Sequence, residues 1–230
     1  MRRVIVIVLC LLLALVVAAP MATAQQKTGT GVGKKQIGEL SAAWWQQVMT
    51  ETKSPECGPL EQDVIEGDVF YLANFSGQVD AECTVPSGSR ILAPVFNVAC
   101  SPQFGDQGTV QDLRDLCRSI FDYAWKNATD VEVTVDGQEV EEESIVCADA
   151  PLFNLTVPKG SFSIKAGFGI EGTGPAVASG CWILLEPLSP GEHIITIEGT
   201  FPLNPDIFGT DENGEPFTFT QTATYTLTVE

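Results

Sequence analysis

Histidine and basic residues are scarce in this 230-residue chain. It contains one histidine, His193, and 12 Lys and Arg residues against 30 Asp and Glu, so the formal net charge is -18. Any mechanism that needs a histidine base, such as a Ser-His-Asp or Cys-His arrangement, must therefore use His193. The acidic balance argues against nucleic acid and anionic membranes as partners, because both carry negative charge.

Motifs of well-known catalytic and cofactor sites are also absent. The chain has no G-x-S-x-G, no H-E-x-x-H, no phosphate-binding loop and no dinucleotide fingerprint. It has no C-x-x-C pair, which argues against zinc. We therefore expect a non-catalytic protein without a cofactor. The alternative is a secreted hydrolase that acts on polysaccharide through paired carboxylates, since such pairs meet in space and not in sequence.

Long apolar runs are confined to the N-terminus. Arg2 and Arg3 precede an apolar run from Val4 to Ala19, and Ala22-Thr23-Ala24 has the small-x-small pattern that signal peptidase cleaves. The rival interpretation, a retained anchor, needs a longer run of roughly 20 apolar residues. We expect residues 1–24 to be a signal peptide and the product to be extracellular, periplasmic or on the cell surface. Cleavage removes two arginines and no acid, so the net charge changes from -18 to -20.

The remaining chain predicts a short tether and one domain. Residues 25–36 are polar and glycine-rich, which is typical of a flexible tether, and residues 37–230 are expected to form a single disulfide-linked domain. Ile37, Leu40, Trp44 and Val48 share one face of a predicted helix. Trp45 beside them is a candidate for stacking on a carbohydrate, although tryptophan at helical spacing more often packs in a core.

Six cysteines follow the predicted signal peptide. An even number in an exported chain indicates a disulfide framework, for which 15 pairings exist. Pairing of nearest neighbours along the chain is our prediction. The predicted pairs are Cys57 with Cys83, Cys100 with Cys117, and Cys147 with Cys181.

The last stretch, Phe217 to Val229, has the most regular pattern. Apolar residues alternate there with six threonines, which predicts a long strand with one buried and one wet face. A strand of this kind needs a sheet to lie in and a second layer to cover its apolar face. We expect its open edge to be able to accept a strand from another chain.

Other segments supply the predicted partners. A helix is expected from Leu113 to Ala124, capped by Thr109 with Asp112 three residues on. Asp136-Gly137 predicts a tight hairpin turn, and Gly169 to Gly180 is expected to be a glycine-rich loop. The fold class predicted is mainly β, a β-sandwich or jelly-roll-like domain with two peripheral helices. Its strands are expected at 68–75, 78–85, 90–98, 131–135, 153–157, 162–170, 181–188 and 193–197, besides the last one.

One loop concentrates oxygen ligands. Asp206, Asp211, Asn213 and Glu215 crowd the segment before the last strand, and such oxygens suit calcium. The spacing is not that of an EF-hand, and a solvated turn explains the same residues. Calcium is thus the candidate metal, and His193 and Trp45 are the candidate binding residues.

Several blocks resemble those of exported bacterial proteins of unknown function. They are Ala43-Trp44-Trp45-Gln46, Cys83-Thr84-Val85-Pro86-Ser87-Gly88, Pro94-Val95-Phe96-Asn97 and Pro187 to Ile195. The resemblance implies a secreted microbial β domain and carries no activity with it. Taken together, we expect a secreted, non-catalytic β-sandwich that binds a glycan, a surface or a protein, or that assembles with copies of itself through an edge strand.

Overall fold

The computed structural model of the chain describes residues 32–230. The predicted signal peptide, residues 1–24, and most of the predicted tether lie outside this range. Helix α1 begins at Lys34, so residues 34–36 belong to the domain and not to the tether. Within residues 32–230, no helix is both long enough and apolar enough to cross a membrane.

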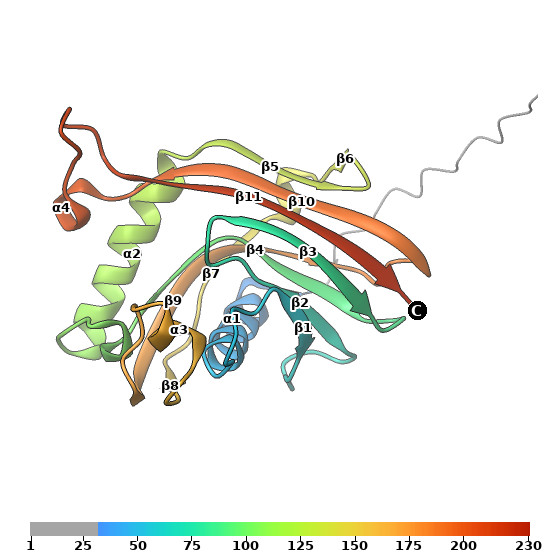
Figure 1. Cartoon of the computed structure of the whole chain (residues 1–230), viewed down its shortest axis with the longest axis horizontal. Coiled ribbons are helices and arrows are strands. Elements are labelled where there is room, and N and C mark those ends of the chain that lie inside the picture. Colours follow the sequence, from blue (N-terminus) through green and yellow to red (C-terminus); the bar gives the residue numbers. More distant parts are fainter. Residues whose placement is uncertain (1–31) are drawn as a thin grey trace, which may run out of the picture.

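Two sheets form a sandwich, as the sequence predicted (Figure 1). We call the six-stranded one sheet 1 and the five-stranded one sheet 2. Sheet 1 has the order β1 (Cys57–Leu60), β2 (Val69–Leu72), β4 (Arg90–Cys100), β9 (Gly172–Leu185) and β7 (Val146–Asp149), with β8 (Phe153–Val157) also paired to β9. Sheet 2 has the order β3 (Gln78–Val85), β11 (Thr218–Val229), β10 (Gly191–Pro202), β5 (Thr129–Val135) and β6 (Gln138–Glu139).

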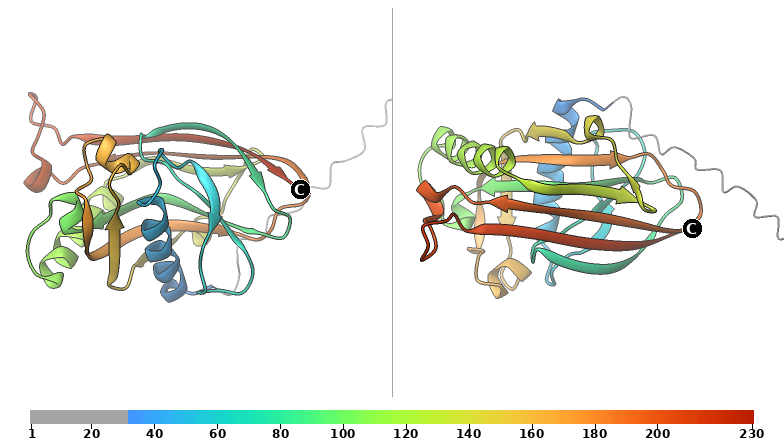
Figure 2. Two further views of the ribbon diagram at one scale, coloured as in Figure 1. Left: turned by 60° about the horizontal axis from the view of Figure 1, so that its bottom comes forward. Right: turned by 90° about the horizontal axis from the view of Figure 1, so that it is seen from above.

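Two long helices cover parts of the sandwich that the sheets leave open. Helix α1 (Lys34–Val48) lies on the outer face of sheet 1 and runs across the strand direction (Figure 2). Helix α2 (Val110–Lys126) stands at one end, between the layers (Figure 1). The short helices are η1 (Pro102–Phe104), η2 (Glu142–Ser144), α3 (Phe162–Lys165) and α4 (Pro205–Phe208).

Helix α2 begins where its sequence predicts. The Thr109 hydroxyl accepts a hydrogen bond from the Asp112 amide at 3.3 Å, and the Asp112 carboxylate accepts one from the Thr109 amide at 2.7 Å. These reciprocal bonds satisfy two amides that the first helical turn leaves without partners. The cap fixes the register in which Leu113, Cys117 and Phe121 face the strands.

The apolar residues form two large cores, one on each face of sheet 1. The inner core lies between the sheets and contains Phe96, Phe201 and Tyr225, with the Phe96 and Phe201 rings stacked at 4.4 Å. The outer core lies under α1 and contains Trp44 and Trp182. Sheet 1 is therefore the middle layer of three, while the outer face of sheet 2 is exposed to solvent.

The terminal strand is confirmed as a strand, but most of its expected open edge is paired. Strand β11 pairs with β10 on one side, antiparallel, and with β3 on the other, parallel. From Thr222 to Val229, both rows of backbone groups are thus used within sheet 2, so this part of β11 offers no open edge to a foreign strand. A pattern of alternation identifies the buried face of a strand, but it does not say how many neighbours the strand has.

Two segments near the middle of the chain differ from their predictions. Residues 162–170, predicted as a strand, begin with the single helical turn α3, which is followed by a loop. Residues 169–180, predicted as a loop, contribute most of β9. The strand predicted from Cys181 is thus confirmed, but it begins nine residues earlier, at Gly172. The earlier part was predicted as a loop because small residues such as Ala176 and Gly180 do not alternate there with polar ones.

Two of the three predicted disulfides are present. Cys57–Cys83 links β1 of sheet 1 to β3 of sheet 2, and Cys147–Cys181 joins the neighbouring strands β7 and β9. The third prediction is corrected: Cys100 and Cys117 are buried free thiols. They lie in a small apolar cluster between α2 and sheet 1, together with Leu113, Ile120 and Val177.

Candidate functional site

The only histidine is held between two turns. His193 Nδ1 lies 2.8 Å from a carboxylate oxygen of Asp136, and Nε2 lies 2.9 Å from the carbonyl oxygen of Ser189. Because both partners can only accept, the ring satisfies them fully when both nitrogens carry protons. Burial disfavours the charged ring, but these hydrogen bonds outweigh it and raise the pKa of His193.

The same three residues are of the types found in a serine hydrolase triad. The Ser189 hydroxyl, however, is 3.4 Å from His193 Nε2, farther than the Ser189 carbonyl that already occupies this nitrogen. A general base must be free to take the proton of the nucleophile. The arrangement therefore fastens the β5–β6 turn, at Asp136, to the connection between β9 and β10.

Trp45 is not available for stacking on a sugar. Its side chain is buried in the outer core, where it meets Trp44 edge-on at 5.0 Å and contacts Phe75 and Phe104. Both adjacent tryptophans are thus core residues. The expectation that Trp45 stacks on a carbohydrate is therefore not supported.

The proposed calcium loop binds its own backbone. One oxygen of Asp211 accepts hydrogen bonds from the amides of Asn213 at 2.8 Å and Glu215 at 2.9 Å. These bonds lower the pKa of Asp211. Asp206 lies on α4, where its amide donates to the Asn204 side chain. Within residues 32–230, no three Asp, Glu, His or Cys side chains are grouped closely enough to hold a metal ion.

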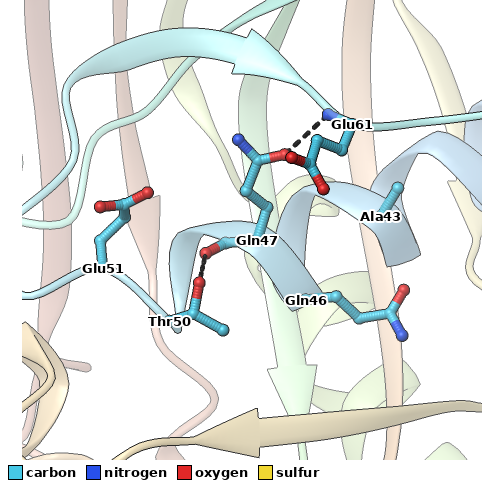
Figure 3. A pocket seen from close by; sticks show the side chains of 6 residues that line it. All are labelled: Ala43, Gln46, Gln47, Thr50, Glu51 and Glu61. Atoms are coloured by element: carbon cyan, nitrogen blue, oxygen red, sulfur yellow. Dashed lines mark hydrogen bonds between the residues drawn. The ribbon is translucent and has the colours of Figure 1, made fainter.

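A polar hollow of about 370 Å³ lies beside the C-terminal half of α1 (Figure 3). Its most central side chain, Gln47, donates to the carbonyl of Pro59 at 2.6 Å and accepts from the amide of Glu61 at 2.8 Å. The Gln47 side chain is therefore hydrogen-bonded to the backbone at the end of β1. The polar groups of this hollow are used to attach α1 to the sheet. Its lining residues are Ala43, Gln46, Gln47, Thr50, Glu51 and Glu61.

A second hollow, of about 390 Å³, is lined by three basic residues, whereas the charged residues of the first are two glutamates. It lies between the first turn of α1, the middle of α2 and strand β7. A smaller hollow of about 100 Å³ continues it along α2 and β9, sharing Arg118 and Asp149. We call the two together the β7 groove. Its charged lining residues are Lys34, Lys35, Arg114, Arg118, Asp122 and Asp149.

The β7 groove concentrates positive charge on an acidic protein. Of the 12 basic residues, Arg2, Arg3 and Lys27 precede residue 32, so nine lie in the described range, and four of these nine line the groove. All 30 acids lie in the same range, but only two line the groove. The groove is thus locally cationic within a surface that is otherwise strongly anionic.

Two lysines of the groove lie at the N-terminal end of α1, where the helix dipole favours negative charge. Lys34 and Lys35 occupy the first turn of α1, which contains no acid. Cations at this end oppose the helix dipole at a cost of about 0.3–1 kcal/mol each. Lys35 has one partner, Glu39, at 3.5 Å, and its side chain is 88% exposed. Apart from this i,i+4 pair, the two lysines at the start of α1 present positive charge to solvent beside β7.

A hydrogen-bonded network fixes the opposite wall of the groove. Arg118 donates to one oxygen of Asp149 through Nε at 3.1 Å and through a terminal nitrogen at 2.6 Å. The Ser179 hydroxyl donates to the other oxygen at 2.7 Å. Partial burial raises the pKa of the Asp149 carboxyl, but these bonds outweigh it and hold the pKa below its usual value. The Arg118 guanidinium is thereby oriented at the groove with its charge retained.

The thiol at the floor of the groove, Cys117, is buried and hydrogen-bonded to the backbone. Cys117 lines the smaller hollow, and its sulfur donates to the carbonyls of Val98 at 3.4 Å and Val177 at 3.7 Å. The hydrogen bond between the two thiols, and their burial, raise the pKa of Cys100. A nucleophilic cysteine requires a thiolate, which this raised pKa disfavours at Cys100.

The sequence contained one sign of the groove, namely a pair of lysines directly before an amphipathic helix. It was assigned to the tether, because two lysines after several glycines are typical of a solvated linker. Arg114 and Arg118 lie within the second predicted helix, Leu113 to Ala124. Nothing in the sequence says that these residues meet at β7, since their elements are far apart along the chain.

Comparisons with known proteins supply no family. No protein-family model matches the chain, and no curated protein matches it. Two solved structures show partial similarity. One is the cysteine protease inhibitor EhICP2 from Entamoeba histolytica, at 11% identity over 65% of this chain and 86% of that chain, with a TM-score of 0.21. The other is Amebosin, at 13% identity over 66% of this chain and 97% of that chain, with a TM-score of 0.19. At these TM-scores the similarities carry no argument about function.

Proposed function

We propose that this chain is an exported, non-catalytic β-sandwich protein that binds an anionic extracellular ligand in the β7 groove. The observation that carries the proposal is the gathering of Lys34, Lys35, Arg114 and Arg118 at one groove of an acidic protein. At physiological salt, charges separated by more than roughly 8 Å are screened from one another. A local cationic groove can therefore attract an anion that the rest of the surface repels.

A non-catalytic role is supported by the state of the titratable groups. In the described range, each carboxyl with a clearly shifted pKa has it lowered: Asp112, Asp149 and Asp211. The general acid of a polysaccharide hydrolase needs a raised pKa, so that it is protonated at neutral pH. The histidine and both thiols have partners that leave them without a catalytic role.

Export is supported by the cleavage pattern before Gln25 and by the two disulfides, which persist in oxidising compartments. N-terminal sequencing of the exported protein tests this part. We expect the product to begin at Gln25, and a product that retains Arg2 and Arg3 would contradict export with cleavage.

Titration calorimetry with soluble polyglutamate tests the binding part. The mature protein is expected to bind it, and the double variant Lys34→Glu/Lys35→Glu is expected to bind at least tenfold more weakly. The control, Lys53→Glu/Lys159→Glu, makes the same change in net charge at two exposed lysines outside the groove and is expected to stay within threefold. Equal losses in both variants, or hydrolysis of polysaccharides by the mature protein, would contradict the proposal.

A further inference from the structure

We propose that the ligand of the β7 groove is an extended acidic peptide, which adds to the free edge of β7 as a further strand of sheet 1. This inference rests on the proposed function and specifies its ligand. The backbone of β7, the cations of the groove and the way α1 covers the other edges of sheet 1 each support it.

The pairing of β7 determines which of its backbone groups face the groove. Cys147 lies opposite Cys181, and the amide of Ala150 donates to the carbonyl of Ala178 at 2.8 Å. In an antiparallel pair, alternate residues exchange hydrogen bonds. Residues 146, 148 and 150 therefore bond to β9, and the amides and carbonyls of Cys147 and Asp149 point away from it, toward the groove.

Side chains of helix α1 bond to backbone groups at the other edges of sheet 1, but within residues 32–230 none of them bonds to the backbone of Cys147. Gln47 bonds to backbone groups at the end of β1, and Gln46 donates to the carbonyl of Asn154 on β8 at 3.2 Å. Gly38 packs so closely on the carbonyl of Asp149 that a Cβ there would lie 2.2 Å from the oxygen. The Cys147 amide and carbonyl and the Asp149 amide remain, in the described part of the chain, without such a cover. Free edges of this kind pair with other strands unless they are blocked.

The charges around this edge select the chemistry of the added strand. Lys34 and Lys35 flank it on the α1 side, and Arg118 and Phe121 flank it on the α2 side. Side chains of an extended peptide alternate between the two sides. Acidic residues at every second position would meet the lysines, and apolar residues between them would lie on the side of Phe121, which lines the groove.

The length of the groove suits a short segment. Strand β7 has four residues, and an extended segment of four residues spans roughly 13 Å. Few hydrogen bonds and a small contact area make a weak complex, for which we expect a dissociation constant on the order of 10–100 μM.

Fluorescence anisotropy on the mature protein tests the inference. The probes are four labelled heptapeptides with glutamate at alternate positions and valine, threonine, alanine or phenylalanine between. We expect saturable binding of at least one of them, weakened at least tenfold by Lys34→Glu/Lys35→Glu and less than threefold by Lys53→Glu/Lys159→Glu. Acids in the first turn favour a helix, so the groove variant is expected to stay folded, which circular dichroism checks.

N-methylation of the bound peptide tests strand addition itself. Only every second amide of an added strand faces β7, so methylation of one alternate set should abolish binding and methylation of the other set should change it less than threefold. Equal effects of both sets would overturn strand addition. Loss with Lys34→Glu/Lys35→Glu together with such equal effects would leave the anion-binding function standing. Absence of saturable binding by all four peptides, or a dimer in light scattering that the peptide does not dissociate, would also overturn the inference.

Discussion

The two sheets of the sandwich bury their strands in different ways. Sheet 2 has one buried face and one wet face, so β11 alternates between buried residues such as Tyr225 and exposed ones such as Thr222. Sheet 1 lies between sheet 2 and α1, and β9 is continuously buried from Ala176 to Leu185. A residue in sheet 1 therefore depends on two neighbouring layers, whereas a residue in sheet 2 depends on one.

The largest effect is expected where α1 covers sheet 1. Trp44 is buried, stands edge-on to Trp182 at 5.5 Å and donates to the carbonyl of Leu72 at 3.0 Å. Trp44→Ala should lower the free energy of unfolding by about 4 kcal/mol in denaturant titrations, because it opens a large cavity. Lys35→Ala on the same helix should change it by less than about 0.5 kcal/mol. A small cost for Trp44→Ala would mean that α1 is not part of the folded core.

The next effect concerns the contact between α1 and β7. Alanine is normally better than glycine within a helix, but a Cβ at Gly38 would meet the Asp149 carbonyl at 2.2 Å. Gly38→Ala should therefore destabilise the protein by about 2 kcal/mol, since the helix must move away from the strand. Gly33→Ala, where nothing lies within 4 Å, is the control. Stabilisation by Gly38→Ala would show that α1 does not pack on β7 as described.

A smaller effect is expected at the thiol pair that joins α2 to sheet 1. Because Cys117 is not part of a disulfide, Cys117→Ala should lower the free energy of unfolding by only about 1 kcal/mol. Titration of the unfolded, unreduced chain with Ellman's reagent should find two thiols, from Cys100 and Cys117. A count of zero, with a cost above about 3 kcal/mol, would mean that the exported protein contains a third disulfide.

The edge of sheet 2 should respond to pH through His193. Its pKa is raised in the folded protein, so the stability from its contact with Asp136 is present below the unfolded pKa of about 6.5 and is lost as pH rises through the folded pKa. His193→Gln should cost about 0.5–1 kcal/mol near pH 6 and less near pH 9, as measured by urea unfolding. A cost that is the same at both pH values would refute the charged interaction.

The smallest effect is expected on the wet face of sheet 2. Thr222 is exposed, and valine has a similar shape and strand preference, so Thr222→Val should change the free energy of unfolding by less than about 0.5 kcal/mol. A loss above 2 kcal/mol in thermal or chemical unfolding would indicate that another layer covers this face.

This difference between the sheets also explains what could be predicted from the sequence. The last strand, the β5–β6 turn at Asp136 and the cap at Thr109 depend on local patterns, and all three are confirmed. The first part of β9, residues 172–180, shows no alternation, so the sequence predicts a loop there and a strand only from Cys181 on. The β7 groove could not be predicted, because its cations come from two helices that only the tertiary fold brings to one strand.

The position of β11 constrains the order in which sheet 2 can form. Strand β11 follows every other strand of sheet 2 along the chain, yet it lies inside that sheet, between β3 and β10. The sheet cannot close until this segment has emerged, and its partner β3 is more than a hundred residues away. Such distant pairing is slow to form. The earlier strands of sheet 2 therefore wait for the C-terminal segment, and the sandwich reaches its final shape only after that segment is available.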